Sequence, residues 1–345
     1  MRKAHNFSGA GLAVTAMLVL GLIVAATAFA QAFTGTNGRD RFRGTDQADT
    51  FNTLGGSDIV LGRGGNDQAD LGNGRDLADL GAGDDTGNGG NDSDGIYGAG
   101  GNDTLNGGNG RDLLRGGNDN DALNGDDGAD RLFGGNGNDV IKGFQDSDFI
   151  GGNAGDDELE GDVPGNGVGG GDRIYGGDGN DTIRGGEGRD RTHGGAGNDT
   201  SDGGNGPDIM SGGTGDDTQA GGEGPDVIFA NTGVDTTNGG NGNDKLWALA
   251  RADVTPGPNG ETDTVGDTLN GEGGNDVIRV RDGEVDTVTC GDGNDLVYAD
   301  RVDNVAADCE RVFRNDPKEK VAKKEAQQEG QEDANQSPKD DKLTK

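Results

Sequence analysis

Single apolar residues recur along most of this chain at intervals of nine, each lying between two residues that are more polar or smaller. Leu105, Leu114, Leu123 and Leu132 show the interval clearly. Side chains of a strand alternate between its two faces, so such a triplet is a minimal strand whose middle side chain points inward. The pattern therefore predicts a succession of three-residue strands, each burying one residue. Other inward residues are Ile141, Ile150, Ile174 and Ile183, whereas Ala69, Ala78, Gly87, Thr192, Ser201, Gln219 and Thr237 predict looser packing.

Aspartate follows the same interval and lies two positions before each inward residue. Insertions near 163–166 and near 256–258 interrupt an otherwise regular count of 28 aspartates, in which we include Asp253. Glycine lies two positions before 21 of the 28, which gives the nonapeptide G-G-x-G-x-D-x-U-x, where U is apolar. Its clearest copies begin at Gly134, Gly176, Gly221 and Gly239. A tandem repeat of this kind predicts a solenoid.

Composition explains why apolar burial alone cannot order this chain. Its 345 residues include 74 glycines, and only 28% are hydrophobic. The net charge of −35 lies almost entirely in the repeats, so nucleic acid is not an expected partner. Aspartates stacked about 4.8 Å apart repel one another, and about 18 divalent ions would neutralise the region. We therefore expect metal binding to drive folding.

The nonapeptide resembles the calcium-binding repeat of hemolysin-type (RTX) proteins, over roughly residues 35–298. The resemblance implies an all-β parallel β-roll with two repeats per coil. Calcium ions would lie between turns eighteen residues apart, in one row along Asp103, Asp121 and Asp139 and a second along Asp112, Asp130 and Asp148. About fourteen coils would form a rod near 65 Å long.

Calcium is the expected cofactor because glycine turns can aim several carbonyl oxygens at one point while aspartate adds a carboxylate. Seven residues replace the glycine before the aspartate and make their turns doubtful calcium sites: Gln47, Asp92, Asp119, Asp146, Arg251, Val265 and Glu284. The candidate ligands are Asp40, Asp58, Asp67, Asp76, Asp103, Asp112, Asp130, Asp139, Asp157, Asp172, Asp181, Asp190, Asp199, Asp208, Asp217, Asp226, Asp244, Asp276 and Asp295.

The two ends of the chain differ from the repeats. Arg2 and Lys3 precede an apolar stretch that ends in Ala28-Phe29-Ala30, which is typical of a secretory signal peptide; an uncleaved anchor is the alternative. From Asp316 onward the chain has a mixed charge and almost no apolar residues, which predicts a disordered tail. We expect a signal peptide at 1–30, roll blocks at 31–160, 172–255 and 256–298, an insertion at 161–171, a cap at 299–315 and the tail at 316–345.

Cys290 and Cys309 are the only cysteines, and in an exported protein we expect them to form a disulfide; two free thiols are the alternative. The surrounding segment resembles the end cap of secreted actinobacterial β-roll proteins, which implies that it closes the last open edge of the roll.

We find no catalytic site in the sequence. The histidines are His5, in the leader, and His193, at an expected solvent-facing position. The sequence favours a secreted, non-enzymatic calcium-binding protein of the envelope, matrix or a cell-adhesion system, without membrane insertion after signal cleavage. The alternative is the accessory roll of a calcium-dependent hydrolase or epimerase, although Gln31 to Asp40 leaves no room for a catalytic module. An ice-binding or ligand-binding face on one flat sheet stays open as an alternative, since it would need only a regular row of outward side chains; no such row of threonines is expected.

Overall fold

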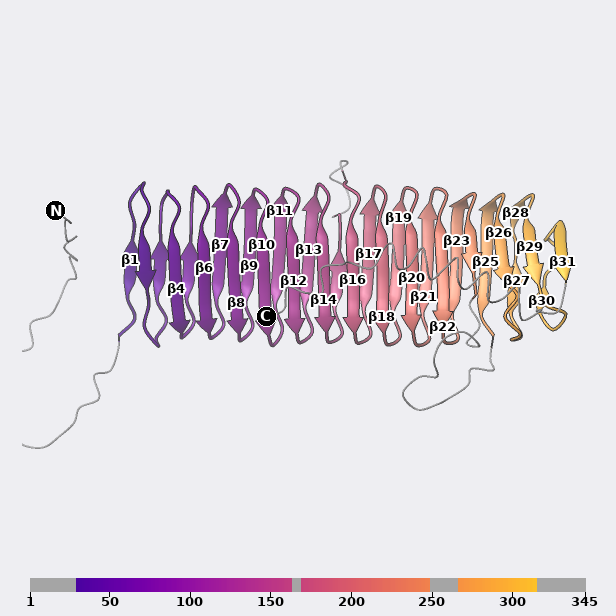
Figure 1. Ribbon diagram of the computed structural model, residues 1–345, viewed down its shortest axis with the longest axis horizontal. Coiled ribbons are helices and arrows are strands. Elements are labelled where there is room, and N and C mark those ends of the chain that lie inside the picture. The colour runs from indigo at the N-terminus through magenta and orange to yellow at the C-terminus, as the bar shows by residue number, and fades with distance from the viewer. Residues whose placement is uncertain (1–28, 163–168, 249–265, 315–345) are drawn as a thin grey trace, which may run out of the picture.

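The computed structural model describes residues 29–162, 169–248 and 266–314. Within these ranges the chain consists of strands and turns and contains no helix. It winds into a rod of stacked coils, and the colour runs steadily from the first coil at one end to the last at the other (Figure 1). The predicted parallel β-roll with two repeats per coil is confirmed.

Alternate strands belong to two parallel sheets that face each other across the rod. Sheet A has 16 strands: β1 (Ala32–Thr34), β3 (Thr50–Asn52), β5 (Gln68–Asp70), β7 (Thr86–Asn91), β9 (Thr104–Asn109), β11 (Ala122–Asp127), β13 (Val140–Gln145), β15 (Glu158–Glu160), β17 (Thr182–Glu187), β19 (Thr200–Asn205), β21 (Thr218–Glu223), β23 (Thr236–Gly242), β25 (Thr268–Gly274), β27 (Thr287–Thr289), β28 (Asp292–Gly293) and β30 (Asn304–Val305).

Sheet B has 15 strands: β2 (Arg41–Arg43), β4 (Ile59–Gly64), β6 (Leu77–Ala82), β8 (Gly95–Gly100), β10 (Leu113–Asn118), β12 (Arg131–Asn136), β14 (Phe149–Ala154), β16 (Arg173–Asp178), β18 (Arg191–Ala196), β20 (Ile209–Thr214), β22 (Val227–Thr232), β24 (Lys245–Trp247), β26 (Val277–Val280), β29 (Leu296–Ala299) and β31 (Arg311–Arg314).

The register keeps equivalent repeat positions side by side. Leu114 pairs with Leu132 eighteen residues later. Across the first insertion the separation becomes 24 residues, and across the second it becomes 32, yet the same repeat positions still pair. Asp235 is followed directly by Asp267 in its row, so the pairing runs past Asp253, which lies outside the described residues.

Most strands are longer than the three residues predicted, so that prediction is wrong. The strand β10 runs for six residues, LLRGGN, and continues through both glycines of the next turn. Gly117 pairs with Gly135 in the neighbouring coil. A β-carbon on Gly135 would lie 2.0 Å from the carbonyl oxygen of Gly117, so a larger residue there would require the backbone to shift. Ala99 and Asn153 occupy the same register position in neighbouring strands, so glycine is favoured but not required in every coil.

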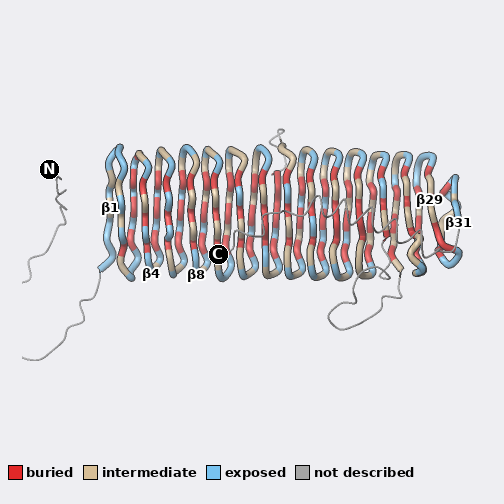
Figure 2. Tube along the Cα trace, in the orientation of Figure 1, coloured by how far each residue is buried: buried red, intermediate tan, exposed pale blue. Residues whose placement is uncertain are grey.

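Inward side chains of successive strands form a column along the interior, to which some strands add a second apolar residue, as β6 does with Ala78 and Leu80. Buried positions recur along the rod (Figure 2). The eight predicted leucines and isoleucines from Leu105 to Ile183 are all at most 1% exposed. The apolar column then divides into two clusters. Thr192 and Ser201 lie between the clusters, where both inward positions of one coil carry a hydroxyl. Small or polar residues at these positions are buried as expected.

Sheet A presents a row of threonines on its outer side, which contradicts the expectation that no such row exists. Threonine occupies the first position of six successive strands, β17 to β27. Their register pairs each threonine with the next. Comparing each repeat with the next one along the chain does not reveal this row, because only every second repeat contributes a strand to sheet A. The six residues are Thr182, Thr200, Thr218, Thr236, Thr268 and Thr287.

We expect Leu123→Ala to lower the free energy of unfolding by about 3 kcal/mol, because it leaves a cavity between the neighbouring inward residues Leu105 and Ile141. Chemical denaturation in saturating calcium measures the change. The matched control is Thr104→Ala on the outer side of β9, which should cost less than about 1 kcal/mol. Equal losses would show that the interior column does not stabilise the roll.

Candidate metal-binding site

Each turn between the sheets presents one aspartate at the edge of the roll. In the repeat from Gly134 to Asp139, Gly135 and Gly137 have φ values of 127° and 125°, a left-handed region that favours glycine. A β-carbon on Gly134 would lie 2.1 Å from Oδ2 of Asp139. The first glycine of the repeat is therefore required because the carboxylate folds back against it.

The aspartates of successive coils are linked in two rows, one at each edge. The backbone N–H of Asp121 donates to Oδ1 of Asp139 at 2.8 Å, and that of Asp139 donates to Oδ1 of Asp157 at 2.7 Å. The second row repeats the contact from Asp112 to Asp130 at 2.7 Å. One carboxylate oxygen of each aspartate is thus used to hold neighbouring coils in register.

The other carboxylate oxygen, Oδ2, is buried. Eighteen of the nineteen predicted ligands have an Oδ2 atom without a hydrogen-bond partner among the described residues; Asp40 is the exception. A buried carboxylate oxygen with no donor is costly, and a repeated one calls for a bound cation. The eighteen are Asp58, Asp67, Asp76, Asp103, Asp112, Asp130, Asp139, Asp157, Asp172, Asp181, Asp190, Asp199, Asp208, Asp217, Asp226, Asp244, Asp276 and Asp295.

Further aspartates with a buried Oδ2 were absent from the predicted ligands; they include Asp85, Asp94, Asp121, Asp148 and Asp286. Three of these lie two residues after an aspartate that replaces glycine. Asp92, Asp119 and Asp146 have φ values of 75°, 72° and 70°, so these residues adopt the left-handed turn that glycine adopts elsewhere. The intact nine-residue interval was the signal that could have identified Asp85, Asp94, Asp121 and Asp148.

Oxygens from two successive coils converge above the first glycine of each turn. A β-carbon on Gly194 would lie 2.3 Å from Oδ2 of Asp199 and 2.4 Å from the carbonyl oxygen of Gly212. On Gly221 the corresponding distances to Asp226 and Gly239 are 2.5 and 2.3 Å. Carboxylate and carbonyl oxygens are the ligands that calcium prefers. The donor set therefore fits calcium.

Burial makes the ionised carboxylates unfavourable in the absence of a cation. Loss of solvent, with smaller contributions from neighbouring aspartates, raises the pKa of Asp148 to about 9 and that of Asp190 to about 8. The hydrogen bond from the preceding coil lowers each pKa but does not compensate. The same cause raises the pKa of Asp94 and Asp217 to about 7. A bound cation would remove this penalty.

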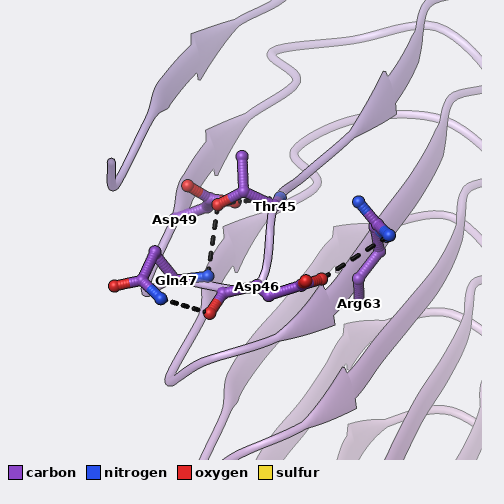
Figure 3. Close-up of polar contacts among 5 residues, drawn as sticks. All are labelled: Thr45, Asp46, Gln47, Asp49 and Arg63. Atoms are coloured by element: carbon purple, nitrogen blue, oxygen red, sulfur yellow. Dashed lines mark hydrogen bonds and ion pairs between the residues drawn. The ribbon is translucent and has the colours of Figure 1, made fainter. Parts of the chain in front are cut away.

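The first two turns satisfy their carboxylates without a metal, and Figure 3 shows the second of them, with Thr45 and Asp49. Oδ2 of Asp49 accepts hydrogen bonds from the backbone N–H of Thr45 at 2.6 Å and from its hydroxyl at 3.0 Å. Thr36 makes the same two contacts with Asp40, at 2.7 and 2.9 Å. Asp40 therefore does not offer the oxygen that the sequence predicted, because a threonine replaces the second glycine of its turn.

The C-terminal segment continues both rows with residues outside the regular count. The N–H of Asp286 donates to Oδ1 of Asp303 at 3.4 Å, and the N–H of Asp295 donates to Oε2 of Glu310 at 2.9 Å. The sulfur atoms of Cys290 and Cys309 lie 2.02 Å apart, at bonding distance. Asp308 lies close to both, but sulfur atoms joined to each other are not free to bind a metal.

We expect the metal-free chain to be more ordered at acidic than at neutral pH. The raised pKa values mean that the folded roll retains protons that an unfolded aspartate, with a pKa of 3.8, releases. Stability therefore falls as the pH rises from about 4 through the folded pKa values. Circular dichroism in chelator should show β-structure gained on acidification and lost again near pH 8. An unchanged spectrum, or one with more β-structure at high pH, would contradict this.

A family comparison agrees with this geometry. The model of the RTX calcium-binding nonapeptide repeat matches residues 34–69, 97–132, 124–159, 166–201, 202–218, 211–246 and 264–284. No curated protein matches the chain as a whole. The matched segments cover more than half of the sequence, and the two rows of buried aspartates lie within and between them. The chain therefore belongs to the family of RTX calcium-binding nonapeptide repeat proteins.

Proposed function

We propose that this chain is a secreted calcium-binding protein whose roll folds as many calcium ions enter the turns, and that it serves as a non-catalytic component outside the cell. The observation that carries the proposal is the set of buried Oδ2 atoms without donors, repeated along both edges. The aspartates would supply carboxylate oxygens and the first glycines would supply carbonyl oxygens. Calcium would neutralise the repulsion between coils, so binding would provide free energy for folding.

The proposal of a location outside the cell has two supports. The first thirty residues have the pattern of a cleaved signal peptide, although most of them lie outside the described residues. A disulfide between Cys290 and Cys309 would persist in an oxidising compartment and would fasten the last coils. In the part of the chain that the structure describes, no helix is long and apolar enough to cross a membrane.

The proposed absence of catalysis follows from the side chains that the roll offers. His193 is the one histidine among the described residues, and it lies exposed on the outer side of sheet B, next to the ring of Tyr175. The acidic groups recur once per turn, and their oxygens are used between coils or directed at the proposed ion. Such a repeated arrangement suits a scaffold that responds to calcium.

Calcium titration of the chain from Gln31 onward tests the proposed folding mechanism. We expect a cooperative gain of β-structure by far-ultraviolet circular dichroism at submillimolar to millimolar calcium, reversed by chelator. Equal magnesium should not reproduce the change, because magnesium sheds its water reluctantly. A roll that is fully folded at neutral pH in chelator, or a chain that stays disordered in calcium, would refute the mechanism.

A single carboxylate substitution tests the assignment of the edge aspartates. Asp121→Asn removes one proposed ligand at the middle of its row and should raise the calcium concentration at the folding midpoint several-fold, with a lower ion count by equilibrium dialysis. Asp178→Asn makes the same change of charge at an exposed residue and should leave both quantities unchanged. If the two variants behave alike, net charge and not ligation controls folding.

A further inference from the structure

Asparagine followed directly by glycine recurs along the roll. In this dipeptide the backbone nitrogen of glycine attacks Cγ of the asparagine readily, because glycine has no side chain to hinder the approach. A bond forms between that nitrogen and Cγ, ammonia leaves, and water then opens the cyclic succinimide to aspartate or isoaspartate. The described residues contain 11 such pairs, which begin at Asn37, Asn73, Asn88, Asn106, Asn109, Asn124, Asn136, Asn205, Asn238, Asn241 and Asn270.

The fold requires the glycine of such a pair but not the asparagine. In the repeat from Gly134, Asn136 is the third residue and Gly137 the fourth, with a φ of 125°. A β-carbon on Gly137 would collide with the carbonyl oxygen of Asp119 in the neighbouring coil. The third position is less restricted, since alanine occupies it at Ala196. The reactive dipeptide therefore arises wherever asparagine fills a position that other residues also fill.

The folded roll holds both reacting groups of these turns apart. The backbone N–H of Gly137 donates to the carbonyl oxygen of Ala154 in the following coil at 2.8 Å. The side-chain Nδ2 of Asn136 donates to Oδ1 of Asn118 in the preceding coil at 2.9 Å. Cyclisation needs a free glycine nitrogen with Cγ against it, so both contacts between coils must break first. The same two contacts hold Asn109 with Gly110 and Asn205 with Gly206.

The pair Asn37-Gly38 in the first turn is restrained only locally. The N–H of Gly38 donates to Oγ1 of Thr36 at 3.1 Å, within the same turn, and not to a carbonyl of the next coil. Asn37 is exposed, and β1 is the first strand of sheet A in the described part of the chain, so no coil precedes this turn there. The same dipeptide thus occurs once without the contacts between coils that hold Asn136.

We propose that the Asn-Gly turns are sites of spontaneous deamidation from which calcium protects the chain, and that Asn37 is the site left open in the folded roll. The proposal goes beyond the proposed function and rests on it, because protection requires a roll that calcium folds. Without calcium, Asn136 and Gly137 lose their contacts with both neighbouring coils, and the glycine nitrogen reaches Cγ. The reaction consumes only water and releases ammonia, so no enzyme is needed.

The products would oppose refolding. Each replaces an amide by a carboxylate, which adds negative charge to an edge where aspartates such as Asp139 already repel one another. Isoaspartate also routes the backbone through Cβ and lengthens the turn by one carbon. Such a turn no longer matches its neighbours, which pair residue by residue as Gly135 does with Gly117. A chain that has spent time without calcium would therefore need more calcium to refold, and restored calcium would not reverse the change.

Peptide mapping by mass spectrometry tests the proposal on the chain from Gln31 onward, incubated at neutral pH in calcium or in chelator. We expect deamidation at Asn136 to be about tenfold slower or more in calcium, because the contacts between coils must open first. Asn37 should react at a similar rate in both samples. The tryptic peptide 132–142 also contains Asn138, which precedes Asp139 and not glycine, so it should stay largely intact in both.

Refolding of the aged samples tests the consequence. The chain aged in chelator should contain more isoaspartate, measured by enzymatic methylation, and should need several-fold more calcium to reach its folding midpoint than the chain aged in calcium. The matched variant is Asn136→Ala, which places there the residue found at Ala196. It should remove the reaction from peptide 132–142 and leave the calcium midpoint of fresh protein unchanged.

Circular dichroism of each sample separates this proposal from the folding mechanism. A chain that is unfolded in chelator, yet deamidates at Asn136 no faster than in calcium, overturns the proposal and leaves calcium-driven folding intact. A roll that stays folded in chelator and protects Asn136 there overturns both, since calcium then controls neither. If Asn37 reacts as slowly as Asn136 in calcium, contacts between coils do not determine protection. If Asn138 reacts as fast as Asn136 in chelator, the glycine is not what makes the site.

Discussion

The whole roll depends on the close spacing of carboxylates along its edges. Parallel strands bring equivalent residues about 4.8 Å apart, so one aspartate per turn becomes a line of like charges on each side of the rod. Hydrogen bonds from the preceding coil use one oxygen of each carboxylate, as between Asp121 and Asp139. The second oxygen is left buried without a donor. The same geometry that makes the coils uniform therefore creates the demand for a cation at most turns, whereas threonine satisfies the carboxylate at the first two.

This constraint explains why so little apolar surface is enough. Each strand buries only a few side chains, and the inward positions of one coil carry only the small hydroxyl groups of Thr192 and Ser201. A globular domain with such an interior would not fold. In the roll, the contribution of ions along two edges replaces that of a thick core. The outer faces of both sheets are then free to vary, and they differ: sheet A carries threonine and sheet B carries arginine with aromatic rings.

The periodic features of the fold could be predicted from the sequence because they depend on residues at fixed distances. Inward residues such as Leu123 and the division into two rows of aspartates follow from intervals of nine and eighteen. Features that depend on contacts between coils could not be predicted. Three examples depend on backbone positions in three dimensions. Strands continue through Gly117, Thr36 donates hydrogen bonds to the Asp40 carboxylate, and Asp119 adopts the left-handed turn that glycine adopts elsewhere. The threonine row was missed because a face of the roll samples only alternate repeats.

The pairing of residues eighteen apart limits how such a chain can change in length. Loss or gain of eighteen residues removes or adds one coil, and every later residue keeps its sheet and its neighbours. Loss of nine residues would instead exchange the two sheets beyond that point, so that Thr200 would join the surface of Arg131 and Phe149. Both rows of aspartates would survive such a change, but each outer face would be broken in two. Inheritance of an intact face therefore favours duplication and deletion of repeats in pairs.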